Sequence, residues 1–342
     1  MTAVRAGSLP GLDLERLAAY LRELPGGPVL ERVELVDGGR SNLTFSLTTS
    51  AGSFVLRRPP LADVAPSAND VGREFRVMRA LRNSAVPVPR TVALCTDTTV
   101  VGAPFSLVEK VTGRVLRHPA DVAALDAGQA RAVVESLVQH LVELHRVDVD
   151  AVGLGGLGRP AGFVARQVAR WQAQREHVAT RPLPAADDLC RRLRRRVPAG
   201  GRASLVHGDY RLDNVMVDAA DPSRIVAVLD WELTTLGDPL TDLGLLLVYR
   251  EPECAPVLPH GNPFDGNPHV PTADDIARRY GELSGIPLDD LGFHRALGCF
   301  KLAVIAEGIH RRHLAGLTVG SGFDSVGDAV EALLNRGLEL LT

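Results

Sequence analysis

The stretch LVHGDYRLDNVMVD, residues 205–218, sets a group of polar side chains between two short apolar runs. Strand-forming residues stand on both sides, and the polar part contains His207, Asp209, Arg211, Asp213 and Asn214. A simple turn needs little more than one glycine and one asparagine or aspartate. The surplus of ionisable side chains therefore indicates a functional loop between two strands rather than a plain connection.

A carboxylate and a carboxamide in this loop have the spacing of a phosphoryl-transfer motif. Asp209 precedes Asn214 by five positions, as in H-R-D-x-x-x-x-N, where Asp accepts the proton of the substrate hydroxyl and Asn holds Mg²⁺. Sixteen positions after Asn214, the apolar run Ile225–Leu229 ends in Asp230, which would supply a second oxygen ligand. Each residue alone is as typical of a turn, but the ordered set predicts a catalytic base and a magnesium site.

Bulk composition is that of a globular protein with one or two lobes. The 342 residues are 45% hydrophobic and 23% charged, as in ordinary globular domains. A net charge of -3 argues against a nucleic-acid partner, which favours a strong basic excess. No apolar run approaches the roughly 18 residues of a membrane span, and the start lacks a signal peptide, so we expect no membrane partner and a cytoplasmic location.

The four cysteines are widely separated and contain no C-x-x-C pair. Scattered thiols in a chain of this length are typical of reduced, buried side chains rather than of bridges or metal ligands. The cysteines are Cys95, Cys190, Cys254 and Cys299.

The pattern of predicted elements changes near residue 111. Alternating strand formers dominate before it and helical spacing dominates after it. We therefore expect an α+β fold with a small β-rich nucleotide-binding lobe, residues 1–110, a linker near 105–111, and a large helical lobe, residues 111–342, that carries the catalytic loop and the acceptor site. The predicted strands are Val29–Val36, Leu43–Thr48, Ser53–Arg58, Arg90–Cys95, Pro104–Glu109, Ala203–Val206, Val215–Val217 and Arg224–Leu229. The predicted helices are Asp13–Leu24, Ser67–Leu81, Asp121–Arg146, Gly162–Ala179, Pro239–Tyr249, Ala273–Leu283, Asp289–Ala315 and Val326–Leu341, and Glu251–Pro271 is expected to be a long loop.

Two quoted motifs carry a resemblance to a known family. HGDYRLDN, residues 207–214, followed by LDWELTTLGDPLTDLG, residues 229–244, resembles the aminoglycoside phosphotransferase family, especially the kinase-like domain fused to some acyl-CoA dehydrogenases. The resemblance extends from about residue 28 to 330 and implies a protein-kinase-like bilobal fold that uses ATP and Mg²⁺. For the matched positions it implies a catalytic base at Asp209, metal ligands at Asn214 and Asp230, a bracing role for His207, and a tie from Asp242 to the loop.

A glycine-containing segment in the small lobe matches a phosphate-covering loop. DGGRSN, residues 37–42, lies between two predicted strands. Gly38 and Gly39 allow a close approach of the backbone, and Ser41 and Asn42 offer donors to phosphate. Taken by itself, the same pattern is also typical of a plain hairpin.

Other small-lobe positions complete the predicted nucleotide site. In the predicted strand Ser53–Arg58, the run FVLR, residues 54–57, matches V-A-I-K in pattern but has Arg57 where the motif has lysine. Glu74 in the following helix is the natural partner of Arg57. A guanidinium can bind both a glutamate and a phosphate oxygen. Phe105–Lys110 matches the linker between lobes, where backbone groups of Glu109 and Val111 would contact the adenine.

The residues after Asp230 favour a small-molecule kinase. Trp-Glu replaces the Phe-Gly of protein kinases, and no long phosphorylatable loop precedes the next helix. Residues 159–196 contain ten arginines and three acids, a net charge of 10 − 3 = +7. This excess is equally typical of a solvated helix face. If it borders the acceptor, an anion such as a hydroxyacyl-CoA or hydroxy acid is favoured over a polycationic aminoglycoside.

Candidate acceptor contacts follow from that reasoning. Arg166, Arg170 and Trp171 share one predicted helix, and Arg211 and Glu232 lie near the motifs. Two alternative functions stay open: an antibiotic kinase acting on aminoglycosides, and a nucleotide-binding pseudokinase scaffold, which the arginine at the lysine position favours. The segment HRRH, residues 310–313, is interpreted as a solvated helix face rather than a metal pair.

Overall fold

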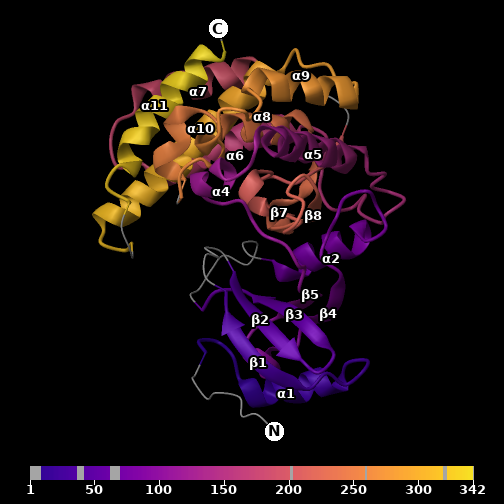
Figure 1. Cartoon of the computed structure of the whole chain (residues 1–342). Helices are drawn as coiled ribbons and strands as arrows, with labels where there is room; N and C mark the ends of the chain where they lie inside the picture. The colour runs from indigo at the N-terminus through magenta and orange to yellow at the C-terminus, as the bar shows by residue number, and fades with distance from the viewer. Residues whose placement is uncertain are drawn as a thin grey trace. The chain divides into compact units, whose positions relative to one another are not determined.

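The structure is a computed structural model, and it describes residues 9–36, 42–61, 70–200, 203–258, 260–318 and 322–341 (Figure 1). Two compact units make up the chain: Met1–Thr112 with Val226–Thr234, and Gly113–Ile225 with Thr235–Thr342. The sequence predicted a small lobe that ends at residue 110 and did not assign Val226–Thr234 to it. Nothing in the local sequence marks residues 226–234, because their grouping with the first unit is a long-range property.

The first unit is built on a five-stranded antiparallel sheet in the order β1-β2-β3-β5-β4. Alternating apolar residues of its central strands point to one face, where Phe45, Leu56 and Leu107 are fully buried. Phe45 lies opposite Leu56, and Leu56 opposite Leu107. The strands are Leu30–Leu35 (β1), Leu43–Thr49 (β2), Gly52–Arg58 (β3), Thr91–Cys95 (β4) and Phe105–Glu109 (β5).

Two longer helices complete the first unit, together with the short helix α3, Thr98–Val101. Helix α1, Leu14–Glu23, begins after Asp13, whose carboxylate accepts the N–H of Arg16, and its apolar side joins the sheet core. Helix α2, Val71–Leu81, is capped in the same way by Asp70 and buries Glu74. The helix was predicted to start at Ser67, which lies outside the described residues.

The second unit is mainly helical. Its longest helices, α5 and α10, carry continuous buried faces, and the α10 face packs against α8 and α11. Short strands and 3₁₀ turns lie between α7 and α8. The helices are Pro119–Ala123 (α4), Ala127–Arg146 (α5), Phe163–Val178 (α6), Pro184–Arg195 (α7), Leu240–Val248 (α8), Ala273–Ser284 (α9), Leu291–Leu314 (α10) and Val326–Glu339 (α11).

Two helices differ from the prediction. The single helix expected over 121–146 is wrong, because Asp126 starts a new helix. Its carboxylate accepts the N–H of Gln129 at 2.8 Å, and the Gln129 side chain accepts the N–H of Asp126 at 3.1 Å, a capping box. Helix α7 was not predicted, although Pro184 at its first turn is a start signal.

Short strands frame the opening motif. Ser204–Val206 (β6) pairs with Thr235–Gly237 (β9), a strand that the sequence did not predict. The 3₁₀ turn Leu212–Asn214 (η1) leads into Val215–Val217 (β7), and Ile225–Val228 (β8) follows. The remaining 3₁₀ turns are Trp231–Leu233 (η2), Pro252–Val257 (η3) and Pro263–Gly266 (η4), and the last two divide the expected loop over 251–271.

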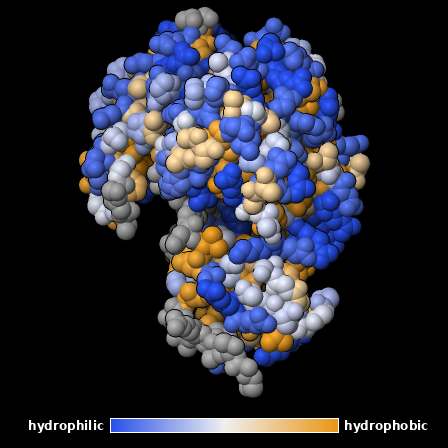
Figure 2. Space-filling view, viewed as in Figure 1, coloured by the Kyte–Doolittle hydropathy of each residue, from blue (hydrophilic) through white to orange (hydrophobic). Residues whose placement is uncertain are grey.

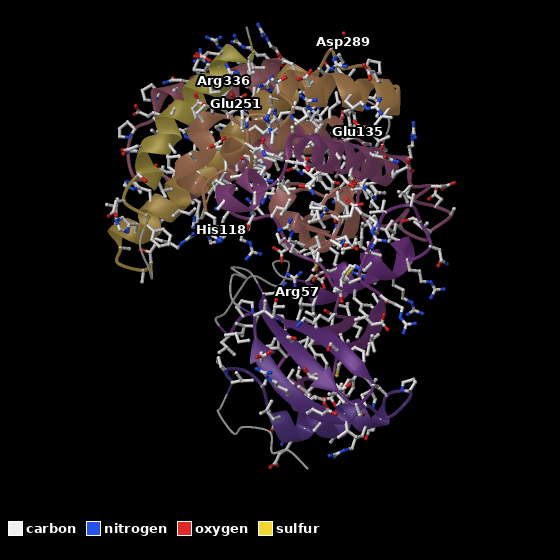
Figure 3. All side chains as sticks on the ribbon, in the orientation of Figure 1. Arg57, His118, Glu135, Glu251, Asp289 and Arg336 are labelled. Carbon is white, nitrogen blue, oxygen red and sulfur yellow. The ribbon has the colours of Figure 1, made fainter. Side chains whose placement is uncertain are left out.

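A partly buried ion cluster connects the C-terminal helices. Glu251 accepts from Arg295 of α10 and, at 3.1 Å, from Arg336 of α11 (Figure 3). All four cysteines are buried and free. The face of the helical unit shown in Figure 2 is predominantly hydrophilic. Within the described residues, every helix is too short or too polar to cross a lipid bilayer.

Candidate active site

One buried carboxylate holds the loop between β6 and η1 by hydrogen bonds to its backbone. Asp242 of α8 accepts the backbone N–H of His207 at 2.6 Å and that of Gly208 at 2.8 Å. Gly208 has φ of 87°, a conformation that glycine adopts without steric cost. The predicted tie from Asp242 to the loop is therefore present in the second unit.

A second pair of side chains holds Asp242 itself. His145 of α5 lies 3.3 Å from the Asp242 carboxylate through Nε2 and 2.7 Å from the Tyr280 hydroxyl through Nδ1. Burial would raise the pKa of Asp242, but His145, His207 and the Gly208 N–H outweigh it and lower that pKa. The loop is thus anchored to a buried carboxylate that stays ionised.

Two donors orient the carboxylate of Asp209. The Tyr249 hydroxyl donates to Oδ1 at 2.6 Å, and the Asn214 amide donates to Oδ2 at 3.1 Å. The same amide also donates to the Asp209 carbonyl oxygen at 2.8 Å. The Asp209 N–H donates to Nδ1 of His207 at 3.3 Å, so His207 braces the loop. These hydrogen bonds hold the Asp209 carboxylate in one orientation.

The charges around Asp209 keep it ionised. Burial raises its pKa, but Arg211, Lys301 and the Tyr249 hydrogen bond outweigh burial, and the pKa lies below its usual range. Arg211 lies 3.6 Å from Asp209 and 3.3 Å from Asp213, and its guanidinium stacks 5.1 Å above the Tyr249 ring. An ionised, oriented carboxylate of this kind can accept a proton.

In the first unit, Arg57 of β3 lies between two carboxylates. Its guanidinium donates to Glu74 at 2.5 Å and to Asp230 at 3.4 Å. The Arg57 side chain is 19% exposed, that of Glu74 2% and that of Asp230 32%. The Arg57–Glu74 pair anticipated from the sequence is formed, with arginine in the position where kinases have lysine.

This cluster has more negative than positive charge. Burial raises the pKa of Glu74 to about 7, and Asp230 and Glu232 add to the rise, although Arg57 opposes it. Burial lowers the pKa of Arg57, but the three carboxylates outweigh burial and raise it. One guanidinium therefore faces three carboxylates, a balance that suits a further cation.

Asp230 has an unusual backbone. At φ of 67° and ψ of 60° it is left-handed, the sole non-glycine residue with positive φ in the described chain. Such conformations cost roughly 1–2 kcal/mol and gather at functional sites. The strain and the partial exposure of the carboxylate fit a ligand-binding role better than a turn.

The two predicted metal ligands, Asn214 and Asp230, belong to different units. The described residues contain no group of three or more His, Cys, Asp or Glu side chains placed to hold a metal. Mg²⁺ bound with nucleotides commonly uses only one or two protein oxygens beside phosphate and water. Because the Asn214 amide nitrogen is engaged with Asp209, its Oδ1 is the atom that would face a cation. The roles of Asn214 and Asp230 stay predictions.

Part of the predicted nucleotide site lies outside the described residues, namely Gly38, Gly39 and Ser41. Asn42 is buried and donates to Glu232 at 3.2 Å. Glu109 pairs with Arg90 at 2.5 Å, and its N–H donates to the Arg90 carbonyl at 2.8 Å. Because the Glu109 N–H already donates to Arg90, only the Glu109 carbonyl would be left to contact an adenine.

The second predicted adenine contact, Val111, has a different backbone environment. The N–H of Val111 makes no backbone hydrogen bond within the described chain. This leaves Val111 as the better donor of the two predicted adenine contacts.

The arginines predicted for the acceptor separate in the structure. Arg166 turns back to donate to the carbonyls of Arg159 and Ala161. Arg166 and Arg170 are in the same helix, as predicted, but these local carbonyl partners bind the Arg166 side chain. Arg170 and Trp171 line a cavity of about 510 Å³ instead.

Sequence reasoning missed two residues that contact the loop. Tyr249 and Lys301 lie 40 and 93 positions from their partners in the loop. Lys301 donates to the Gly208 carbonyl at 2.9 Å, and burial lowers its pKa. The one available signal was compositional, because only two lysines occur in the chain.

Comparison with curated proteins finds relatives that are much longer than this chain. The chain is 34% identical to "Acyl-CoA dehydrogenase family member 11" of Rattus norvegicus over 337 residues, which cover 96% of this chain and 43% of the relative. The chain thus spans less than half of that relative.

Solved structures give matches over nearly the full length. A putative aminoglycoside phosphotransferase from Ralstonia eutropha JMP134 is 32% identical, with a TM-score of 0.82, and the match covers 96% of this chain and 98% of that one. A complex of aminoglycoside phosphotransferase APH(4)-Ia with AMP-PNP and hygromycin B is 17% identical with a TM-score of 0.61, over 95% and 97% of the two chains, and shares the fold.

Residues 32–271 match the APH model, described as the phosphotransferase enzyme family. The predicted α+β, kinase-like fold and the resemblance on which it rested are confirmed. The chain belongs to the phosphotransferase enzyme family, whose members are small-molecule kinases with a hydroxyl group as acceptor.

Proposed function

We propose that this chain transfers the γ-phosphoryl group of ATP to a hydroxyl of a small anionic metabolite, such as a hydroxyacyl-CoA or hydroxy acid. The observation that carries the proposal is the Asp209 carboxylate, ionised and oriented by Tyr249 and Asn214. A base fixed in this way matches the one side-chain acid–base role that phosphoryl transfer requires.

The proposed chemistry uses few protein groups. Asp209 accepts the proton of the acceptor hydroxyl, whose oxygen bonds to the γ-phosphorus while the bond from that phosphorus to the β–γ bridging oxygen breaks, releasing ADP. Asn214 and Asp230 would hold Mg²⁺, which neutralises phosphate charge when bound. Arg57, fixed by Glu74, would donate to a phosphate oxygen in place of the usual lysine.

The cations near the base support an anionic acceptor. Arg211 and Lys301 act on Asp209 electrostatically, and Arg170 acts on Lys301 in turn. A polycationic acceptor would be repelled from this part of the helical unit, whereas an anionic one would be attracted. The neighbour with hygromycin B supports a small-molecule acceptor without fixing its charge.

Turnover against a panel of acceptors tests this function. Purified protein with Mg-ATP is incubated with hydroxyacyl-CoAs, hydroxy acids, amino alcohols and kanamycin, and ADP release and phosphorylated product are both measured. We expect turnover on an anionic alcohol. Efficient phosphorylation of kanamycin with no activity on anionic alcohols would overturn the proposal.

A further inference from the structure

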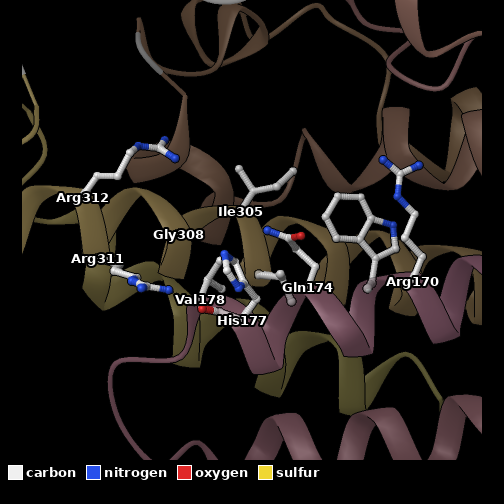
Figure 4. Close-up of a pocket in the computed structure, with 10 residues that line it drawn as sticks. Arg170, Gln174, His177, Val178, Ile305, Gly308, Arg311 and Arg312 are labelled. Atoms are coloured by element: carbon white, nitrogen blue, oxygen red, sulfur yellow. Dashed lines mark hydrogen bonds between the residues drawn. The ribbon is translucent and has the colours of Figure 1, made fainter. Parts of the chain in front are cut away.

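A cavity of about 510 Å³ lies between α6 and α10 and is lined almost entirely by basic and apolar side chains (Figure 4). Its volume is within the range of small-molecule sites. The lining contains no aspartate or glutamate. It consists of Arg170, Trp171, Gln174, His177, Val178, Val304, Ile305, Gly308, Arg311 and Arg312.

The two helices run in the same direction along this cavity. Trp171 lies near the start of the cavity beside Lys301, whose Nζ is 5.8 Å from the indole centroid. Further along, Val178 packs against Gly308, where an added Cβ would meet it at 3.5 Å. The cavity is therefore a trough that follows α6 and α10 side by side.

One end of the trough lies beside the catalytic loop. Lys301, which contacts the Trp171 ring, also donates to the carbonyl of Gly208, the residue before Asp209. From Arg170 to His177 the trough follows seven residues of helix, a length of about 10 Å at a rise of 1.5 Å per residue. The far end is thus about two helical turns from the end beside the loop.

Cations mark both ends. In Figure 4, Arg170 stands at one end and Arg311 and Arg312 at the other, with Gln174 and Ile305 between them. Arg311 donates to the His177 carbonyl, which fixes its side chain at the wall. Within the described residues neither Arg170 nor Arg312 has a carboxylate partner. The nearby Glu307 faces away, since Thr180 donates to it at 2.6 Å.

We infer that this trough binds the distal, phosphate-bearing end of the acceptor whose hydroxyl reaches Asp209. The inference rests on the proposed phosphotransferase function. Guanidinium pairs suit phosphate oxygens, and the indole with the apolar wall suits a carbon or ring portion between the charges. A short hydroxy acid does not fit, because a few bonds of about 1.5 Å cannot carry its carboxylate across about 10 Å.

A binding experiment tests the trough without turnover. The probe is adenosine 3′,5′-bisphosphate, titrated by calorimetry into protein saturated with AMP-PNP and Mg²⁺, so that the nucleotide site is occupied. Arg312→Glu should weaken probe binding roughly tenfold to a hundredfold, because a charged contact becomes a repulsion. Arg195→Glu, an equal charge change on exposed α7, should leave it unchanged. A double variant, Arg311→Gln with Arg312→Gln, removes the charge without adding carboxylates.

A kinetic experiment identifies the source of the phosphate. A hydroxyacyl-CoA is compared with the same hydroxyacyl group on pantetheine, which lacks phosphates. Arg312→Glu should raise KM for the CoA ester roughly tenfold or more and leave KM for the pantetheine ester and for ATP unchanged. Turnover of both esters with equal KM, unaffected by Arg312→Glu, would overturn the inference while the proposed function stands.

Two further outcomes separate the proposals. Bisphosphate that binds without competing with the acceptor would show a site for a separate anion and refute the assignment to the acceptor. Failure of both esters and of every other anionic alcohol in the panel to react would refute the proposed function and, with it, the acceptor assignment, even if charge-dependent bisphosphate binding is intact.

Discussion

The phenolic hydroxyl of Tyr249 donates a 2.6 Å hydrogen bond to Oδ1 of Asp209, so that one helix end orients the carboxylate of a loop 40 residues earlier. Burial and the Asp209 charge raise the pKa of Tyr249 well above its usual value, so it stays a donor. The pair gives Tyr249 a positioning role rather than a chemical one.

Tyr249→Phe should shift the pH dependence of turnover. The hydrogen bond helps to lower the pKa of Asp209, so its loss raises that pKa, and the acid limb of the kcat/KM profile moves to higher pH. Activity measured on the acid limb, where Asp209 is partly protonated, should fall by about tenfold, a typical cost of losing one hydrogen bond to a charged group, while activity near neutral pH changes less. Tyr210→Phe is the control, since Tyr210 donates to Leu137 instead. Coincident profiles for Tyr249→Phe and wild type would contradict the role.

Asp209→Asn should abolish transfer while nucleotide binding is kept. A general base contributes about 10²–10⁴-fold, and the amide cannot accept the proton. Single-turnover transfer and calorimetry with AMP-PNP measure the two effects. The matched control is Asp218→Asn, a turn carboxylate paired with Arg224. A loss of less than tenfold would argue against Asp209 as the base.

Asp230→Ala should weaken nucleotide binding much more with Mg²⁺ than without it. A metal ligand acts only when the metal is present, whereas a structural turn residue acts in both conditions. Calorimetric titration of AMP-PNP with Mg²⁺ or with EDTA supplies the comparison. Asp221→Ala, in the turn before β8, is the control. Equal losses in the two buffers would remove the metal role.

Glu74 should make the first unit less stable as pH rises. Its pKa of about 7 exceeds the ordinary 4.5, so between these values the folded chain keeps a proton that the unfolded chain loses, and stability falls through that window. Glu74→Gln cannot ionise, so its stability relative to wild type should increase from pH 5 to pH 8, by at most about 3 kcal/mol.

Fluorescence can follow this unit alone. The two tryptophans belong to different units. Trp231, which is buried, lies in the first unit, and Trp171 lies in the second. In a Trp171→Phe background, urea unfolding read from Trp231 reports the first unit. The exposed Glu34→Gln on β1 is the control. Parallel stability curves for Glu74→Gln and its parent across this pH range would contradict the raised pKa.

Local patterns in the sequence predicted most elements. The five strands of the first sheet differ from prediction by one or two residues at their ends, because alternation between Phe45, Leu47 and their neighbours specifies the buried face. Helix α5 was extended too far, since apolar spacing continued across a capping box that starts at Asp126. Strand β9 has three residues, too few for any period to show.

Site residues were predictable where a motif holds them together. Asp209 and Asn214 lie within one loop, and their spacing along the chain brings their side chains into contact. Tyr249, Lys301 and Arg312 come from helices later in the chain, and only packing brings the first two to the loop. For Arg166 the helix was predicted correctly, but neighbouring backbone carbonyls bind its side chain.

The segment Val226–Thr234 constrains the order in which the two units can fold during synthesis on the ribosome. This segment belongs to the first unit. Its Asp230 pairs with Arg57, and the backbone of Trp231 contacts Glu74. The first 112 residues therefore emerge without part of their own structure, and the first unit is completed only after about half of the second unit, Gly113–Ile225, has been translated. Since domains generally fold as the chain emerges, a fragment ending at Thr112 should be a poor folding unit. Transplanting this enzyme into another protein would require the whole span, not the sheet alone.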